Sequence, residues 1–221
     1  MIRVLAFDLD GTLLDARARQ VHVLAKACLA QNDRAPDEVR FWKLKRTGLT
    51  TIGALEEMGY GQQRARAINA YWIEHVEGSD VLCHDRVLAH AVQALHLARA
   101  HDLMPRILTA RSNAVLVASQ LDNCGLAALA DGVRVVRPAN AATEKAAVLR
   151  EWQAIAMIGD TESDARAAAL ASIPFLAVLT GQRSAAFLAA RSISAFDDVL
   201  SAVEHLVAEE HASRFRPKTV S

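Results

Sequence analysis

Cysteine is scarce in this sequence of 221 residues, which contains only three copies. Cys28, Cys83 and Cys124 stand far apart and form no Cys-x-x-Cys pair, which argues against a disulfide framework and against a cysteine zinc site. Thiols used this sparingly are typical of a reducing compartment. We therefore expect a cytoplasmic protein with free thiols.

A net charge is also lacking, because 25 Lys and Arg residues balance 25 Asp and Glu residues and the pI is about 7.1. A surface that binds nucleic acid broadly needs a clear basic excess. The balance therefore argues against a nucleic-acid partner. It leaves room for a small anionic ligand that is held by a local cationic site.

Long hydrophobic runs are absent, so no segment of the sequence is expected to span a bilayer. The first residues also lack the basic leader and the cleavage pattern of a signal peptide. We therefore expect no membrane partner. Hydrophobic residues nevertheless make up 52% of the chain, which predicts a sizeable core.

The most informative stretch is the first one, where an apolar run from Ile2 to Phe7 is followed by two acids. The run is short and rich in bulky aliphatic residues, which predicts a buried strand. Asp8 and Asp10 follow it, and Gly11 permits a tight turn. The carboxyl end of a strand is where open α/β sheets place their ligands.

Asp8 and Asp10 would repel each other unless a cation or a shared proton relieved the repulsion. Each one is a candidate metal ligand, general acid or base, or nucleophile. The alternative is an Asx turn or a helix cap, which is a common use of an Asp-Gly pair. On these residues alone, both interpretations stay open.

Helical spacing dominates the chain from Asp15 to about Val81. A first helix has Val21 and Leu24 on one face and Arg19 elsewhere, and three further helices are expected at about 36–47, 51–58 and 63–76. This stretch therefore predicts an all-helical unit between sheet-forming segments.

Strands and helices alternate from Asp85 onward. We expect strands over residues 104–108, 133–136, 155–158 and 174–179, and helices over 87–97, 113–122, 144–152, 162–170 and 198–209. This alternation implies right-handed crossovers and a mostly parallel sheet. The expected fold is α/β, with a Rossmann-like core of residues 1–14 and 82–210, an inserted all-helical domain at 15–81 and a flexible tail at 211–221.

Polar residues follow three of the predicted strands. Thr109 ends the second strand, and Asp160 and Asp164 follow a later one. Because the carboxyl ends of parallel strands meet at one edge of a sheet, we expect them beside Asp8 and Asp10. Carboxylates without His or Cys suit Mg²⁺. Helix capping would explain Asp160 and Asp164 if they stood alone.

These residues resemble the motifs of the haloacid dehalogenase-like hydrolase superfamily. The matching motifs are Asp8-Leu9-Asp10-Gly11-Thr12, Thr109, Lys145 and Gly159-Asp160-Thr161-Glu162-Ser163-Asp164. They occur in the family's order and span most of the chain. Asp10 indicates the phosphatase-like branch, because the dehalogenases lack that acid, and the chain looks like the phosphoglycolate-phosphatase-type members.

The resemblance implies a role for each acid. Asp8 would be the nucleophile and would form an aspartyl-phosphate. Asp10 would act as the general acid and then as the general base. Asp8, the backbone carbonyl of Asp10 and the carboxylate of Asp160 would bind Mg²⁺, with Asp164 in the outer shell.

The resemblance also implies that Thr109, the backbone N–H of Ala110 and Lys145 bind the phosphoryl oxygens. Taken alone, Lys145 would be interpreted as a solvated lysine on a helix surface. The pair Ala110-Arg111 departs from the family pattern, in which Asn or Gly often follows the threonine. We expect Arg111 to be a surface residue at the start of a helix.

The helical insert corresponds to the family's cap, which closes over the site and selects the substrate. Lys43 and Arg46 are three positions apart within it and share a helical face. They are therefore candidates for binding a second anionic group of the substrate. A cationic helix C-terminus that is stabilised by the macrodipole is the alternative.

We predict a Mg²⁺-dependent phosphomonoester hydrolase that acts on a small phosphorylated metabolite, as a monomer or a homodimer. A phosphosugar mutase of the same superfamily would use the same acids but would return the phosphoryl group to its substrate. A binding or regulatory protein that keeps the fold without turnover is the alternative from another class.

Overall fold

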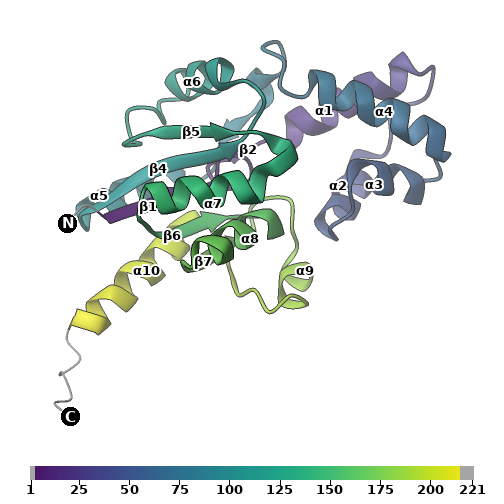
Figure 1. The fold of residues 1–221 in the computed structure, drawn as a ribbon. Coiled ribbons are helices and arrows are strands. Elements are labelled where there is room, and N and C mark those ends of the chain that lie inside the picture. The colour runs from purple at the N-terminus through teal and green to yellow at the C-terminus, as the bar shows by residue number, and fades with distance from the viewer. Residues whose placement is uncertain (1–2, 215–221) are drawn as a thin grey trace.

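The computed structural model describes residues 3–214 and contains a parallel sheet of six strands (Figure 1). The strand order is β5 (Val133–Val136), β4 (Leu103–Ala110), β1 (Arg3–Phe7), β6 (Ala154–Gly159), β7 (Phe175–Val178) and β8 (Ala195–Phe196). All neighbouring pairs are parallel. The α/β fold is thereby confirmed, and β1 is observed from Arg3 because Ile2 lies outside the described residues.

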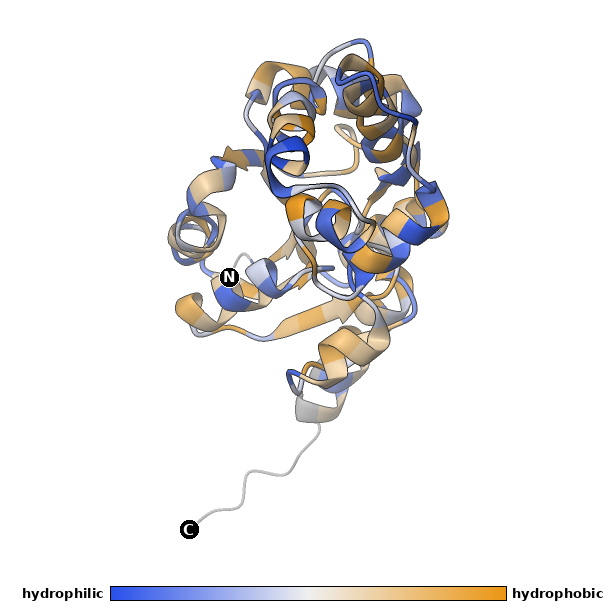
Figure 2. Ribbon diagram, turned by 90° about the vertical axis from the view of Figure 1, so that its right-hand side faces the viewer, coloured by the Kyte–Doolittle hydropathy of each residue, from blue (hydrophilic) through white to orange (hydrophobic). Residues whose placement is uncertain are grey.

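Helices cover both faces of the sheet. One face packs against α5 (Ala91–Ala100), α6 (Ala114–Asn123) and α10 (Val199–Arg214), and the other against α7 (Ala141–Glu151) and α8 (Glu162–Ala171). Alternate residues of β1 serve the two faces, since Leu5 and Phe7 belong to the first core and Val4 and Ala6 to the second. Figure 2 shows these buried strands largely in the hydrophobic colour. Burial on both faces explains why the strands are continuous apolar runs.

Four helices form a separate group beside the sheet (Figure 1). They are α1 (Arg17–Ala30), α2 (Glu38–Arg46), α3 (Thr51–Glu57) and α4 (Gln62–His75), and together they are called the helical insert (residues 17–75). The insert has its own core, which includes Leu24, Phe41, Leu55 and Ile68. Its apolar stripes therefore pack mainly against each other and leave the sheet edge accessible.

The segments that enter and leave the insert pair with each other, which corrects one prediction. β2 (Leu14–Asp15) and β3 (Arg86–Val87) form an antiparallel ladder, and a short 3₁₀ helix, η1 (Leu82–His84), precedes it. The predicted helix over 87–97 is wrong at its start, because Val87 pairs with Leu14 and α5 begins only at Ala91. A short apolar run fits either element, and here the distant partner strand decides.

The C-terminal helix is longer than predicted. α10 runs to Arg214, so the first four residues of the predicted tail are helical, and the rest of that tail lies outside the described residues. On the C-terminal side of β4, three small elements were not predicted: η2 (Pro138–Asn140), α9 (Ala185–Ala189) and the short strand β8. Within residues 3–214, no helix has both the length and the apolarity needed to cross a membrane.

Candidate active site

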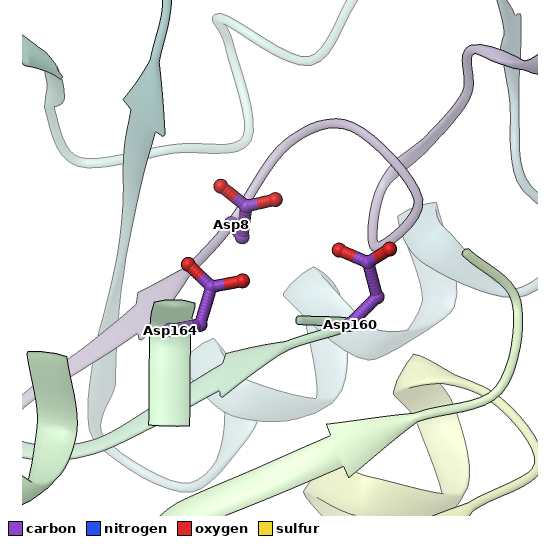
Figure 3. A group of neighbouring side chains, drawn as sticks. All are labelled: Asp8, Asp160 and Asp164. Atoms are coloured by element: carbon purple, nitrogen blue, oxygen red, sulfur yellow. The ribbon is translucent and has the colours of Figure 1, made fainter. Parts of the chain in front are cut away.

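The ends of β1 and β6 bring the first and last predicted acids together. These strands are neighbours, and the Asp8 N–H donates to the Ile158 carbonyl at 2.9 Å. Asp160 directly follows β6, and Asp164 lies in the first turn of α8. Asp8, Asp160 and Asp164 each offer a carboxylate oxygen within 4.8 Å of the other two, and all three residues are buried (Figure 3).

Lys145 joins two of these acids. From α7, its Nζ donates to Oδ1 of Asp8 and to Oδ1 of Asp164, both at 2.6 Å. Burial by itself would lower the pKa of Lys145, but Asp164 and Asp8 outweigh it and raise that pKa. The lysine is therefore buried and charged, and it does not lie on a solvated helix surface.

Asp164 is held from its other side by a capping box at the start of α8. The Thr161 hydroxyl donates to Asp164 Oδ2 at 2.6 Å, and the Asp164 N–H donates to Thr161 Oγ1 at 3.4 Å. Both carboxylate oxygens of Asp164 thus accept hydrogen bonds. This arrangement suits a residue that orients Lys145 more than one that binds a metal directly.

Asp160 has one oxygen with a partner and one without. Its Oδ2 accepts from the backbone N–H of Gln182 at 2.6 Å, whereas its buried Oδ1 has no hydrogen-bond partner within the described part of the chain. A Cβ on Gly11 or on Gly181 would collide with this carboxylate. This loop after β7 was not predicted to take part in the site, although a glycine just beyond a parallel strand was an available signal.

The donor set fits a divalent cation. Three buried carboxylates lie together, and the one buried lysine beside them pairs with only two, Asp8 and Asp164, so the cluster carries excess negative charge. Burial raises the pKa of Asp8 to about 7 and also raises the pKa of Asp160, because the protein alone compensates these charges poorly. Oxygen donors without His or Cys are those of Mg²⁺ sites. Asp8 and Oδ1 of Asp160 are the side-chain groups suited to hold such an ion.

Thr109 and Ala110 end β4, which flanks β1 on the side opposite β6. The register pairs Phe7 with Ile107, so Thr109 reaches the same sheet edge as Asp8. Thr109 is buried there. The structure therefore brings the predicted phosphate-binding pair to the strand next to the predicted nucleophile.

Asp10 lies outside the cluster of three acids, and two arginines hold its carboxylate. Arg111 donates from Nε to Oδ2 at 2.7 Å and from Nη2 to Oδ1 at 2.5 Å, and Arg19 donates from Nη2 to Oδ1 at 3.0 Å. We call this arrangement the arginine clamp. Burial by itself would raise the pKa of Asp10, but Arg111 and Arg19 lower it well below its usual range. Asp10 is therefore a carboxylate in this conformation.

The sequence matches the profile of a known protein family. The profile of haloacid dehalogenase-like hydrolases matches residues 2–172. The chain belongs to this family. That result confirms the family predicted from the motifs. Among curated proteins, no match to the chain was found.

Solved structures share the fold of this hydrolase at low sequence identity. A haloacid dehalogenase-like family protein from Streptococcus pneumoniae is 18% identical with a TM-score of 0.70, over 93% of this chain and 98% of that one. A predicted phosphatase from Clostridium acetobutylicum is 16% identical with a TM-score of 0.70, over 94% and 99%. A predicted phosphoglycolate phosphatase from Haemophilus somnus is 16% identical with a TM-score of 0.69, over 93% and 98%.

The expectation for Arg111 in this hydrolase is wrong, because the residue is buried and does not start a helix. Its N–H donates to the carbonyl of Val136 at 3.1 Å, so the backbone continues the pairing of β4 with β5, and α6 begins at Ala114. Arg19 was also expected away from the buried face of its helix. Its burial depends on Asp10, 9 positions away, and on Asp85, 66 positions away, and helical spacing reveals neither partner.

Asp85 connects the clamp to both ends of the helical insert. Arg19, at the start of α1, donates from Nε to Asp85 Oδ1 at 2.9 Å and from Nη1 to the Val76 carbonyl at 2.8 Å. Gln120 of α6 donates to Asp85 Oδ2 at 2.7 Å. The clamp therefore contacts the segments through which the chain enters and leaves the insert.

A cavity of about 620 Å³ lies between the insert and the sheet edge. Asp10, Ala110 and Arg111 line it from the sheet, and Trp72 and Ile73 line it from α4. Because the predicted general acid faces it, this is the candidate substrate cavity of the hydrolase. A wider hollow of about 900 Å³ on the insert is lined by none of the motif residues.

Lys43 and Arg46 do not line this cavity. Lys43 is exposed, and Arg46 donates from Nη2 to the carbonyls of Leu179 at 3.1 Å and Arg183 at 3.2 Å. Their contact with substrate stays a prediction. The buried lysine of this helix is Lys45, which was not predicted as a site residue, and burial lowers its pKa to about 8.

Proposed function

We propose that this hydrolase is a Mg²⁺-dependent phosphatase that cleaves a small phosphorylated metabolite through an aspartyl-phosphate on Asp8. The observation that carries the proposal is the pairing of Lys145 with Asp8 and Asp164 beside the unpartnered oxygen of Asp160. The excess negative charge needs a divalent cation before an anionic phosphoester can approach. The fold shared with structures described as phosphatases supports the reaction class.

In the first step, a carboxylate oxygen of Asp8 bonds to phosphorus while the bond from phosphorus to the ester oxygen breaks. The leaving oxygen takes a proton from Asp10, so an alcohol departs and the phosphoryl group stays on Asp8. Asp10 is two residues from the nucleophile and lines the candidate substrate cavity. A leaving group in that cavity would therefore face it.

In the second step, water hydrolyses the aspartyl-phosphate. Asp10 takes a proton from the water as the water oxygen bonds to phosphorus, and the bond from phosphorus to Asp8 breaks. Inorganic phosphate leaves, and Asp8 is a carboxylate again. Asp10 must leave the arginine clamp to carry a proton, because Arg111 and Arg19 hold its pKa well below its usual range.

Other residues would stabilise the transferring phosphoryl group. Lys145, Thr109 and the backbone N–H of Ala110 would donate to its oxygens, where charge accumulates in the transition state. Asp8, Asp160 and the backbone carbonyl of Asp10 would hold Mg²⁺. When bound, the ion would neutralise part of the charge on the acids and on the phosphoryl oxygens.

We also propose that residues 15–81 act as a cap domain over a core formed by residues 1–14 and 82–210. The separate core of the insert and the cavity between insert and sheet support this division. Movement of the cap would admit the substrate and then exclude water from the aspartyl-phosphate.

Phosphate release from a panel of small phosphoesters tests the proposed function. With Mg²⁺ the protein should hydrolyse one or a few esters, and a chelator should stop the release. Asp8→Asn should reduce the rate by more than roughly 10³-fold, because it removes the attacking carboxylate. Asp131→Asn alters an exposed ion pair with Arg99 and is the matched control, which should keep full activity.

Unreduced activity of Asp8→Asn would overturn the assignment of the nucleophile. An isomeric sugar phosphate in place of free phosphate would favour the mutase alternative. Tight binding of esters without turnover of any of them would favour the binding protein.

A further inference from the structure

Two buried guanidinium groups border the candidate substrate cavity on the side of Asp10. Arg19 is 2% exposed and Arg111 is 3% exposed, yet both line the cavity. Arg111 directs the fork of its Nε and Nη2 at a single carboxylate, that of Asp10. A guanidinium fork of this kind matches the geometry of a carboxylate or a phosphate.

Arg19 would stay in place without Asp10. Its Nε and Nη1 are bound by Asp85 and by the Val76 carbonyl, and only Nη2 reaches Asp10. Nη2 of Arg111 also lies 3.6 Å from Asp85. The two arginines are therefore anchored behind the cavity, and their remaining donors would face into it if the Asp10 side chain moved.

The fork of Arg111 is occupied by an anion in the present conformation. Asp10 and Asp85 form ion pairs with Arg19 and Arg111, and the charge of Glu77 also acts on Arg111 from a greater distance. If Asp10 rotated toward a leaving group, the buried fork of Arg111 would lose both of its hydrogen bonds to a carboxylate. A second anion in the fork would replace them, and buried donors without a partner are costly.

The position of the fork indicates which part of a substrate would supply that anion. The transferred phosphoryl group belongs beside Asp8 and Lys145, so the leaving portion extends toward Asp10 and the arginines. Glu77 also lines the cavity, and its Oε2 accepts from the backbone N–H of Ser112 at 2.7 Å, so it leaves the Arg111 fork to Asp10.

We propose that Arg111 and Arg19 select substrates whose leaving portion carries an anionic group close to the ester oxygen, and that the Asp10 carboxylate occupies this anion site in the present conformation. The inference rests on the proposed function, since it assigns the leaving-group side of the same site. The shared chemistry is an oxyanion, either a carboxylate or a second phosphate.

The alternative is that the two arginines only position Asp10. In that case the loss of either arginine would slow the hydrolysis of all phosphoesters by the same factor. A role in substrate selection changes the ratio between charged and uncharged esters. This ratio does not depend on the fraction of a variant that is folded, so partial unfolding does not disturb the comparison.

Kinetics with matched esters test the inference. 2-Phosphoglycolate carries a carboxylate where ethyl phosphate has a methyl group, and ethane-1,2-diol bisphosphate carries a second phosphate. The protein should prefer the charged esters in kcat/KM, and Arg111→Met should lower that preference by roughly 10 to 100-fold, because hydrogen bonds to a charged group are lost. Arg111→Lys keeps the charge but not the fork, so it should recover part of the preference.

The two charged esters distinguish a carboxylate from a phosphate as the anion. Arg99→Met, which removes an exposed arginine from an ion pair with Asp131, is the control and should leave the preference unchanged. If Arg111→Met lowered kcat/KM equally for the charged esters and for ethyl phosphate, their ratio would be unchanged. That result would overturn the inference but not the proposed phosphatase function.

Calorimetry on the Asp8→Asn background provides a second readout that needs no turnover. 2-Phosphoglycolate should bind more tightly than ethyl phosphate, and adding Arg111→Met should remove the difference. If no ester were hydrolysed but this preference depended on Arg111, the proposed function would fail and the anion site would stand. Equal affinities for 2-phosphoglycolate and ethyl phosphate would overturn the proposal that Arg111 and Arg19 form an anion site.

Discussion

At the scale of single residues, the site contains two groups of buried acids whose charges are compensated differently. Asp10 and Asp85 face two guanidinium groups, so their charges balance within the protein. Asp8, Asp160 and Asp164 lie together, and Lys145 pairs with Asp8 and Asp164 only. Because burial of uncompensated charge is costly, the second group is where a divalent cation would stabilise the protein most.

Gly181 is the position at which one added methyl group should disturb that second group. Its Cβ would collide with the Asp160 carboxylate, so Gly181→Ala must displace the acid or the loop. We expect the affinity for Mg²⁺ to fall by roughly 10 to 100-fold, as when a group supporting a metal ligand is lost. The thermal midpoint measured against Mg²⁺ concentration reports this affinity.

Gly61→Ala is the matched control, because nothing lies within 4 Å of a Cβ at that position. It should bind Mg²⁺ like the unaltered protein. Equal affinities in the two variants would show that the packing of Gly181 on Asp160 is unimportant for the ion.

At the scale of elements, the end of α2 docks on the loop that follows β7. Arg46 donates to two carbonyls of that loop, and the Ser184 N–H donates back to the Arg46 carbonyl at 3.0 Å. Gly48, with φ of +92°, leaves room for the ring of Phe187. The same loop binds Asp160, so the position of the helical insert is linked to the candidate metal site.

Arg46→Ala should loosen this docking without unfolding the sheet. It removes two hydrogen bonds from a charged donor, each worth about 1.5–3 kcal/mol where the site is dry. Amide hydrogen exchange should become faster in residues 38–46 and 179–187 and stay unchanged in β1 and β6. Lys43→Ala changes an exposed side chain of the same helix and should alter neither segment. Unaltered exchange in Arg46→Ala would contradict the docking role.

At the scale of the whole molecule, the candidate metal site joins segments that are distant in the sequence. Asp8 and Lys145 are 137 positions apart, and the acids come from the first strand and from the β6–α8 unit. An ion that binds only the folded chain stabilises all of it, by about 2.7 kcal/mol at 100 times its Kd. Mg²⁺ should therefore raise the thermal midpoint of the entire fold.

The stabilisation by Mg²⁺ should grow with pH. Burial raises the pKa of Asp8 from 3.8 to about 7 in the metal-free fold, so between these values the folded state holds a proton that the unfolded state lacks. The contribution of Asp8 to stability then falls as pH rises toward 7, and above 7 the ion has no proton to displace from Asp8.

The difference in thermal midpoint between Mg²⁺ and chelator should consequently widen from pH 6 to pH 8. Asp8→Asn lacks one of the two proposed metal ligands whose pKa is raised, Asp160 being the other, and should show a smaller widening. If the midpoint difference between Mg²⁺ and chelator narrowed from pH 6 to pH 8 in the unaltered protein, the assignment of Asp8 as a metal ligand would be contradicted.

Much of the fold and of the acid cluster could be predicted from the sequence. Short apolar runs ending in Asp8 and Asp160 predicted β1 and β6, and the alternation with helices predicted a parallel sheet. Lys145 was found through the order of the motifs. These signals are local. The hydrophobic pattern of a strand or helix, and the residue that follows the element, can be recognised from positions that are close together in the sequence.

Only the tertiary structure decided which charges meet. Arg111 and Arg19 converge on Asp10 from 101 and 9 positions away, and Asp85 joins them from a linker. The short β2–β3 ladder and the contact of Gln182 with Asp160 are also distant in sequence. The composition and spacing of the sequence determined the sheet and the acids at its edge. The partners of each buried charge depend on packing between elements, because a charge is compensated by whatever the fold brings within a few ångströms.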